Sequence, residues 1–239
     1  MSKNLVIIPT YNEKENIHAI LDAVMELPSK FHVLVVDDGS PDGTADLVKE
    51  KQKEFPQIHI HERSGKLGLG TAYIAGFKWA LERDYEFIFE MDADFSHKPK
   101  DLERLLKACQ DGADMSIGSR YVPGGDVKNW TTDRIILSKG AAFYVNAVLW
   151  MGVKDTTAGF VCYTRKVLEA IDLDKIQFIG YAFQIEMKYT TKRLGFKLKE
   201  VPIAFEDRKL GTSKMSMGIF NEAFTGVWKM RFSKVARKS

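Results

Sequence analysis

Phe87-Ile-Phe-Glu-Met-Asp92-Ala-Asp94 joins an apolar run directly to two carboxylates. The apolar run predicts a buried strand, and alternate residues of an extended chain point the same way, so Asp92 and Asp94 can approach one cation. A hard divalent cation held by one or two carboxylates keeps positions open for a diphosphate. The segment therefore predicts a metal site at a strand end, and a solvated acidic turn is the alternative.

A second acidic cluster follows an earlier apolar run. Val33-Leu-Val-Val36 leads into Asp37-Asp38-Gly-Ser40. Parallel strands bring their carboxyl ends to one edge of a sheet, where open α/β folds bind ligands. Gly and Asp also suit an ordinary turn, but two adjacent acids at this edge favour ribose hydroxyls or an exocyclic amine. We interpret the two acidic edges together as a nucleotide-sugar site.

Strand-like and helix-like patterns alternate through the first half of the chain, which predicts an α/β fold with a mostly parallel sheet and helices on both faces. The expected strands cover residues 5–8, 31–36, 58–60, 85–91, 115–118, 157–163 and 198–205. The expected helices cover residues 16–27, 44–55, 70–81, 99–109, 134–151, 183–194 and 217–235, and a loop covers 121–132. We expect one domain over residues 1–215, followed by a C-terminal amphipathic basic helix and tail over 216–239.

Composition limits the class of protein. A chain of 239 residues suits a single α/β domain with a short extension, and its net charge of +3 gives no reason to expect nucleic-acid binding. Cys109 and Cys162 lack metal or disulfide-framework spacing. The chain begins without a signal-peptide pattern, and its longest apolar stretch, 141–153, is too short to cross a bilayer. We expect a soluble or peripheral cytoplasmic protein.

Two further motifs lie near the acidic edges. Pro9-Thr-Tyr11-Asn-Glu13 follows the first strand, and it suits either a planar base or a capped strand–helix turn. Gly65-Lys66-Leu-Gly68-Leu-Gly70 resembles a phosphate loop in composition but lacks Walker spacing. We expect close packing under a nucleotide, with Lys66 near its phosphates. His97 is interpreted as a turn residue rather than a ligand.

Basic and aromatic residues extend this pattern. Arg120 ends an expected strand, so its guanidinium can bind phosphate oxygens or form a surface ion pair. Arg134, Lys139 and the basic loop 207–214 fit a phosphate site or a solvated surface equally well. For much of the 134–151 helix and its aromatic residues we favour the core. Those of the last helix fit either the core or a membrane interface, and its basic end suits a disordered tail or a membrane contact.

Together these motifs resemble the family 2 glycosyltransferases and, within them, the dolichyl- or polyprenyl-phosphate mannose synthases. The resemblance covers nearly the whole chain, through residues 9–13, 36–42, 91–94, 118–121, 136–140 and 207–214. It implies a GT-A fold, which is a Rossmann-like sheet that binds a sugar nucleotide. It further implies transfer of mannose from GDP-mannose to a polyprenyl (dolichyl-type) phosphate, with Mg or Mn as the divalent cofactor.

The resemblance also implies roles for matching residues. Nucleoside contacts are implied for Pro9, Tyr11, Glu13, Val36 and Asp38. Asp92 and Ala93 are implied beside the ribose and phosphates, Asp94 as a metal ligand, and Ser96 where some members place a Gln ligand. Phosphate contacts are implied for Arg120, Arg208 and Lys214, while Lys139 occupies a position often held by Arg. We expect the reaction to depend on Asp92, Asp94, Arg120, Arg208 and Lys214.

The implied acceptor needs little activation. A phosphate monoester has a second pKa of about 6, so it is nucleophilic at neutral pH without a dedicated general base. Attack opposite the nucleotide would invert the anomeric centre. The expected partners are GDP-mannose, the lipid phosphate and the cytoplasmic face of a membrane, with a small membrane-protein partner in some members. The alternatives are a family 2 transferase that uses UDP-glucose or another donor, and a nucleotide-binding membrane-surface module without turnover.

Overall fold

The computed structural model describes residues 3–207 and 218–238, apart from the side chains at 181 and 218–224. Within this part of the chain, a seven-stranded sheet has the order β3-β2-β1-β4-β7-β5-β8. β7 runs antiparallel to β4 and β5, and the other pairs are parallel. The predicted mostly parallel α/β sheet is therefore confirmed. Its strands are β1 (Asn4–Thr10), β2 (His32–Asp37), β3 (Ile58–Glu62), β4 (Phe87–Glu90), β5 (Met115–Ser119), β7 (Val161–Thr164) and β8 (Leu198–Pro202).

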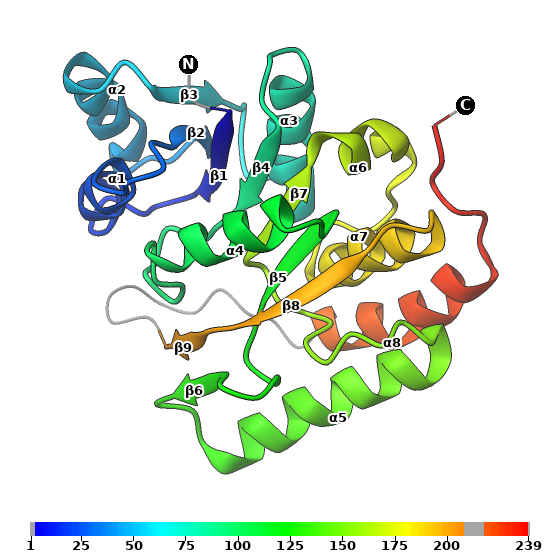
Figure 1. Ribbon diagram of the computed structural model, residues 1–239. Coiled ribbons are helices and arrows are strands. Elements are labelled where there is room, and N and C mark those ends of the chain that lie inside the picture. Colours follow the sequence, from blue (N-terminus) through cyan, green and yellow to red (C-terminus); the bar gives the residue numbers. More distant parts are fainter. Residues whose placement is uncertain (1–2, 208–217, 239) are drawn as a thin grey trace.

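Helices cover both faces of the sheet, as the alternating pattern predicted (Figure 1). One face packs against α1 (Ile17–Met25), α2 (Thr44–Glu54) and α4 (Asp101–Gln110). The core on the other face includes residues of α3 (Leu69–Leu81), α5 (Thr132–Leu149), α6 (Arg165–Ala170), α7 (Tyr181–Arg193) and α8 (Gly218–Phe232). Adjacent residues of a strand point to opposite faces of the sheet. Phe89 thus packs in the core with α1, α2 and α4, and Ile88 packs in the core on the other face.

Two expected segments are corrected where the chain forms a second, small sheet. The expected loop 121–132 contains β6 (Asp126–Lys128), which pairs in parallel with β9 (Ala204–Glu206). The expected strand 198–205 is thus divided: β8 pairs with β5, and the chain then leaves the main sheet for β6. Such short strands, like the short helix α6 and the 3₁₀ turn Leu173–Lys175, leave too few residues for a periodic pattern to be recognised.

The C-terminal tail pairs with the body of the protein after α8. The Asp172 amide donates to the Ala236 carbonyl at 3.0 Å, and the Lys238 amide donates to the Ala170 carbonyl at 3.0 Å. Of the two alternatives left open for the basic end, the disordered tail is therefore wrong for residues 236–238. The division into units 1–215 and 216–239 stays a prediction.

The α5 helix is less buried than expected: Tyr144 packs against the core, but two other aromatic residues of the expected helix do not. Ala142, Val145 and Leu149 face the core, whereas Phe143 and Trp150, the residue that follows the helix, are 76% and 74% exposed. α5 and α8 lie side by side at the bottom of Figure 1. The outer side of this helix pair therefore presents large apolar side chains to solvent.

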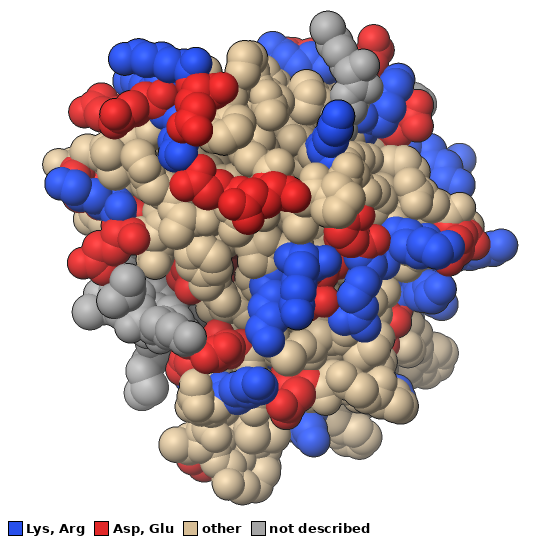
Figure 2. All heavy atoms as spheres, turned by 60° about the vertical axis from the view of Figure 1, so that its left-hand side comes forward, with Lys and Arg blue, Asp and Glu red and all other residues tan. Residues whose placement is uncertain are grey.

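The rest of the surface carries charge of both signs. On the face in Figure 2, Lys and Arg are interspersed with Asp and Glu, as a net charge of +3 leads one to expect. Among the described residues, no helix is both long and apolar enough to span a membrane.

Close packing of α3 on the sheet depends on one glycine. A Cβ atom added to Gly76 would stand 2.7 Å from Cγ2 of Ile7 on β1. That separation is shorter than van der Waals contact, so any side chain at this position pushes α3 away from the strand it covers. The glycine-rich loop 65–70 leads into α3, so the distance between α3 and β1 also positions that loop.

We expect Gly76→Ala to lower the free energy of unfolding by about 1–3 kcal/mol, because the added methyl group overpacks the α3–β1 contact. Urea denaturation measures this change. Gly140→Ala in α5 is the matched control, since a Cβ there meets nothing within 4 Å. The control should be neutral or stabilise by up to about 1 kcal/mol. Equal effects of the two substitutions would contradict the packing argument.

Candidate functional site

The sheet topology brings the predicted motifs to one edge. β1, β2 and β4 are mutually parallel, and β5 runs in the same direction because β7 is antiparallel to both β4 and β5. The segments that follow these strands carry Tyr11, Asp38, Asp94 and Arg120. The strand ends therefore assemble the acidic and basic motifs at the carboxyl edge, as predicted.

Asp37 fixes the turn after β2. Its carboxylate accepts hydrogen bonds from Thr10 Oγ1 at 2.8 Å and from the amide and hydroxyl of Ser40 at 2.8 and 2.6 Å. Thr10 and Asp37 are also paired in the β1–β2 register. The first acid of the pair thus joins two strand ends and supports the neighbouring Asp38.

Asp38 forms a buried ion pair that sequence reasoning missed. Arg63 Nη2 lies 2.6 Å from Asp38 Oδ1, and both side chains are 8% exposed. Arg63 also donates to Thr71 Oγ1 at 2.9 Å, so the pair ties the end of β2 to the start of α3. Arg63 follows a short strand in no recognisable motif, so its position gave no signal in the sequence. The predicted nucleoside role of Asp38 stays a prediction.

The segment after β1 faces the glycine-rich loop. Lys66 Nζ stands 5.2 Å from the centroid of the Tyr11 ring, a cation–π distance. The Glu13 amide donates a hydrogen bond to Thr44 Oγ1 at 3.1 Å, which holds this segment against the start of α2. Pro9 is partly buried and Val36 is fully buried in the core. Contact of Val36 with a nucleoside would therefore fall to its main chain.

The acidic segment after β4 turns sharply into the protein. Phe95 has a φ of 59°, which lies in the left-handed region that non-glycine residues seldom adopt. Asp94 Oδ1 accepts the Ser96 amide at 3.0 Å, and Tyr73 Oη lies 3.4 Å from Asp92 Oδ1. Ala93, Asp94 and Ser96 are 3%, 7% and 4% exposed. The turn therefore holds the two carboxylates close under the surface of the edge.

The side-chain oxygen atoms of this segment are suitable ligands for a hard divalent cation. Asp92 and Asp94 supply carboxylate oxygens, and the predicted third ligand Ser96 supplies a hydroxyl. Within residues 3–207 and 218–238, no cluster of three or more His, Cys, Asp or Glu is placed to hold a metal ion. A Mg²⁺ ion in proteins commonly takes one or two carboxylates and completes its shell with water and substrate phosphates, and these residues fit that pattern. The ligand assignments stay predictions.

His97 packs at the centre of the acidic and basic motifs. Its ring stacks on Phe160 at 4.8 Å and meets the edge of Phe205 at 5.4 Å. Burial lowers the pKa of His97 to about 4, with Asp94 raising the pKa and Arg120 lowering it. Both charges are therefore close enough to act on one imidazole ring. The residue interpreted as part of a turn is a buried packing element within that turn.

Arg120 is held in a bidentate ion pair. Its Nη2 and Nε donate to the two carboxylate oxygens of Asp155 at 2.6 and 2.7 Å, and Nη2 also donates to Thr157 Oγ1 at 3.1 Å. The Asp155 side chain is fully buried and that of Arg120 is 9% exposed. The alternative expected for Arg120 was a surface ion pair. The observed ion pair is buried instead. Sequence reasoning missed Asp155, which lies between the expected helix 134–151 and the expected strand 157–163.

Further cations and aromatic rings border Arg120. The Arg134 guanidinium stands 3.9 Å from the Trp130 ring centroid and pairs with Asp207 at 2.6 Å. Lys139 Nζ stands 5.7 Å from the Tyr121 ring, which Arg120 approaches to 5.2 Å. Cations on aromatic faces keep their charge while their alkyl parts pack, so this border offers positive charge to an anion. The predicted phosphate contacts Arg208 and Lys214 lie outside the described residues.

The fold is an α/β sheet covered by helices on both faces, with charged residues gathered at its carboxyl edge. Residues 5–172 match the family described as Glycosyl transferase family 2. The chain belongs to this family, so the predicted membership is confirmed.

Two curated relatives are similar over nearly the full chain. One is polyprenol monophosphomannose synthase from Mycolicibacterium smegmatis, which is 50% identical over 232 residues that cover 96% of this chain and 88% of the relative. The other is undecaprenyl-phosphate mannosyltransferase from Micrococcus luteus, which is 49% identical over 223 residues that cover 93% of this chain and 91% of the relative.

Solved glycosyltransferase structures share the fold at low sequence identity. Glucosyl-3-phosphoglycerate synthase from Mycobacterium tuberculosis superposes with a TM-score of 0.67 and 17% identity, over 98% of this chain and 80% of that one. A mannosyltransferase from Pyrobaculum calidifontis, in complex with GDP-Man and Mn²⁺, gives a TM-score of 0.62 and 17% identity, over 96% of this chain and 63% of that one. The fold expected from the resemblance is thus borne out.

The pKa of His97 predicts how stability changes with pH. An ordinary His has a pKa of 6.5, and the pKa of His97 in the folded chain is about 4. Between pH 6.5 and pH 4 the unfolded chain therefore binds a proton at this residue and the folded chain does not. Stability is therefore lost as pH falls from 6.5 towards 4, by up to about 1.4 kcal/mol per pH unit. We expect His97→Phe, which keeps the ring, to reduce this loss. Urea midpoints at pH 7, 5.5 and 4.5 test it, and parallel curves for the two proteins would contradict it.

Proposed function

We propose that this chain transfers mannose from GDP-mannose to a polyprenyl phosphate at the cytoplasmic face of a membrane, with a divalent cation. The observation that carries the proposal is the 50% identity, over 96% of the chain, to a polyprenol monophosphomannose synthase. The 49% identity to an undecaprenyl-phosphate mannosyltransferase supports the same acceptor class. The carboxyl edge of the sheet supplies the acidic and basic groups that such a transfer needs.

The acidic side of the edge suits the donor. Tyr11 offers an aromatic face and Asp38 a carboxylate to the nucleoside, and Asp92 and Asp94 would hold the cation beside the diphosphate. A bound divalent cation supplies positive charge that stabilises the diphosphate leaving group. The ion pair between Asp38 and Arg63 fixes the wall of this half, so little of it has to rearrange when the donor binds.

The basic side of the edge suits the acceptor phosphate. Arg134, in the first turn of α5, and Lys139, further along the same helix, stand over aromatic rings and carry charge that an incoming phosphate can meet. Arg208 and Lys214 remain proposed phosphate contacts. A phosphate monoester with a pKa of about 6 is already ionised at neutral pH, so these residues have to orient it rather than deprotonate it. Attack on the face opposite the diphosphate inverts the sugar carbon.

The pair of helices beyond this acceptor side suits a lipid surface. Six of the ten large apolar side chains that are exposed in the described residues lie on or next to α5 and α8: Ile136, Leu137, Phe143, Trp150, Trp228 and Phe232. Arg231 lies 4.7 Å from the Trp150 ring and Trp228 stacks on Phe232, so the aromatic groups of the two helices adjoin. Exposed aromatics with nearby Lys and Arg are typical of helices that lie in a membrane interface.

We expect Asp94→Asn to reduce mannose transfer by at least about a hundredfold, because the substitution removes one negative charge from the proposed cation site. Transfer of radiolabelled sugar into organic-extractable polyprenyl phosphate measures activity, with Mg²⁺, Mn²⁺ or EDTA and with GDP-mannose or UDP-glucose as donor. Asp46→Asn on the exposed surface of α2 is the matched control and should keep full activity. Full turnover in EDTA would refute the metal role, and preference for UDP-glucose would refute the proposed donor.

We expect Phe143→Ser/Trp150→Ser to weaken binding of the purified chain to vesicles of phosphatidylglycerol and phosphatidylcholine, because two exposed rings are removed. Co-sedimentation measures binding. Phe143→Leu/Trp150→Leu retains apolar side chains and should retain much of it. Brominated lipid should quench Trp150 and Trp228 but spare Trp79. Binding by the chain alone would also mean that docking needs no small membrane-protein partner, whereas equal binding of all variants would exclude this surface.

A further inference from the structure

We infer that α7 is a strut that sets the spacing between the donor and acceptor sides of the site, with Gln184 and Lys188 as positioning residues for the transfer step. The inference rests on the proposed function where it concerns turnover. It comes from a buried polar network behind the carboxyl edge, whose α7 residues belong to none of the functional motifs.

The first contact of this network holds the strand that leads to the acidic segment. Gln184 Nε2 donates to Glu90 Oε2 at 2.6 Å, and Tyr163 Oη lies 3.1 Å from Glu90 Oε1. Glu90 is the last residue of β4, two positions before Asp92. Its side chain is fully buried, so these partners fix both oxygens of a carboxylate directly behind the proposed cation ligands.

The second contact holds the segment that anchors Arg120. Lys188 Nζ donates to the Ala158 carbonyl at 2.6 Å and to Gln184 Oε1 at 3.1 Å. Ala158 lies in the segment that contains Asp155 and Thr157, both of which bind the Arg120 guanidinium. Lys188 is itself fully buried. One helix side chain thus holds the backbone on which the acceptor-side ion pair is built.

Gln184 and Lys188 act together because they lie four residues apart on α7, on one face of the helix. Gln184 binds Glu90 through its amide nitrogen and Lys188 through its amide oxygen. The connection is therefore continuous from β4, through the side chains of Gln184 and Lys188, to the 155–158 segment. The rise of one helical turn fixes the distance between these two contacts.

Stability alone is a weak reason to bury these charges. Glu90 and Lys188 are both fully buried, and Gln184 joins them through hydrogen bonds to each. Removing two charges from water costs about as much as their attraction returns, so a well-packed apolar pair is often as stable. What the charged network adds is directional hydrogen bonding that an apolar pair lacks.

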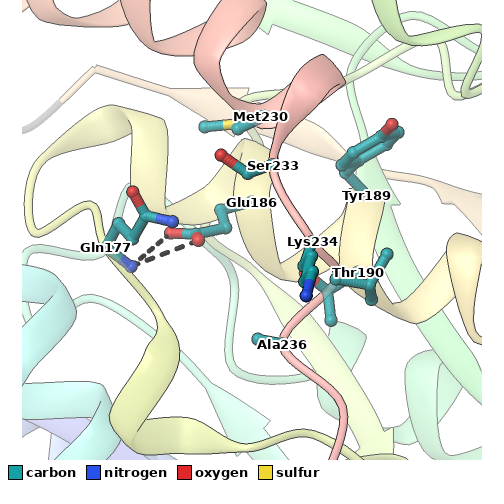
Figure 3. A pocket seen from close by; sticks show the side chains of 9 residues that line it. Gln177, Glu186, Tyr189, Thr190, Met230, Ser233, Lys234 and Ala236 are labelled. Atoms are coloured by element: carbon teal, nitrogen blue, oxygen red, sulfur yellow. Dashed lines mark hydrogen bonds between the residues drawn. The ribbon is translucent and has the colours of Figure 1, made fainter.

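A third polar residue of α7 holds the segment that contacts the glycine-rich loop. Figure 3 shows Glu186 directed at Gln177, and its carboxylate accepts the amides of Gln177 and Phe178 at 2.9 and 3.0 Å. The next residue, Ile179, accepts the Gly70 amide at 2.8 Å through its carbonyl. A Cβ on Gly70 would lie 2.8 Å from the Phe183 ring, so the loop fits closely against α7. Through this contact, α7 also positions the glycine-rich loop.

The test separates positioning from stability by comparing Lys188→Met with Glu90→Gln/Lys188→Met. The single variant leaves a buried carboxylate without its cation and should lose stability, whereas the double variant removes both charges and should recover its urea midpoint. We expect the double variant to keep a kcat lower on the order of a hundredfold, because a displacement of about 1 Å at the reacting groups costs that much. KM for GDP-mannose should change much less than kcat. Val48→Ala in the core of α2 is the control, destabilised but with unchanged kcat.

Hydrogen–deuterium exchange supplies a readout that needs no turnover. Residues 92–97 and 155–160 should exchange faster in the double variant than in the wild-type chain at equal stability. Recovery of kcat together with the urea midpoint, or unchanged exchange in both segments, would overturn the inference and leave a structural ion pair. A wild-type chain that transfers no mannose would refute the proposed function instead, and the exchange data would then decide the positioning role by themselves.

Discussion

The common direction of four strands is the constraint on which this structure depends. Main-chain hydrogen bonds between β1, β2 and β4, and the antiparallel strand β7 between β4 and β5, determine which ends of the strands meet. No single motif would form a site alone, because each contributes one or two side chains. The sheet brings them together, and apolar packing on both faces makes its geometry stiff.

Charge pairs carry the order of the sheet into the loops. Asp38–Arg63 connects the end of β2 to the beginning of α3, and Arg120–Asp155 connects the end of β5 to the segment before β7. Glu200 on β8 accepts the amides of Lys154 and Asp155 at 2.9 Å each. Each pair is desolvated, so its energetic gain is small, but each fixes where a loop lies. Polar groups buried near the edge therefore serve geometry more than stability.

The sequence predicted those features that repeat over many residues or end a strong apolar run. The parallel sheet and the position of Asp94 follow from such patterns, as does the position of Arg120 after its strand. Arg63, Asp155 and Lys188 are single residues whose partners lie far away in the chain, and no local pattern marks them. Glu90 was a visible signal, since a charged residue interrupts an otherwise apolar run. The exposure of α5 also depended on tertiary structure, because aromatic residues suit a core and an interface equally well.

The tight contact between α8 and the loop before α7 has a mechanical consequence. A Cβ on Gly226 of α8 would lie 2.7 Å from the Phe178 ring, and Phe178 adjoins Ile179, which binds Gly70. A close-packed interior has low compressibility, so displacement at one end of such a chain of contacts reaches the other end with little loss. The helix that bears Trp228 and Phe232 is therefore linked to the glycine-rich loop through residues 178 and 179. A displacement of that helix is therefore expected to shift the loop beside the carboxyl edge of the sheet.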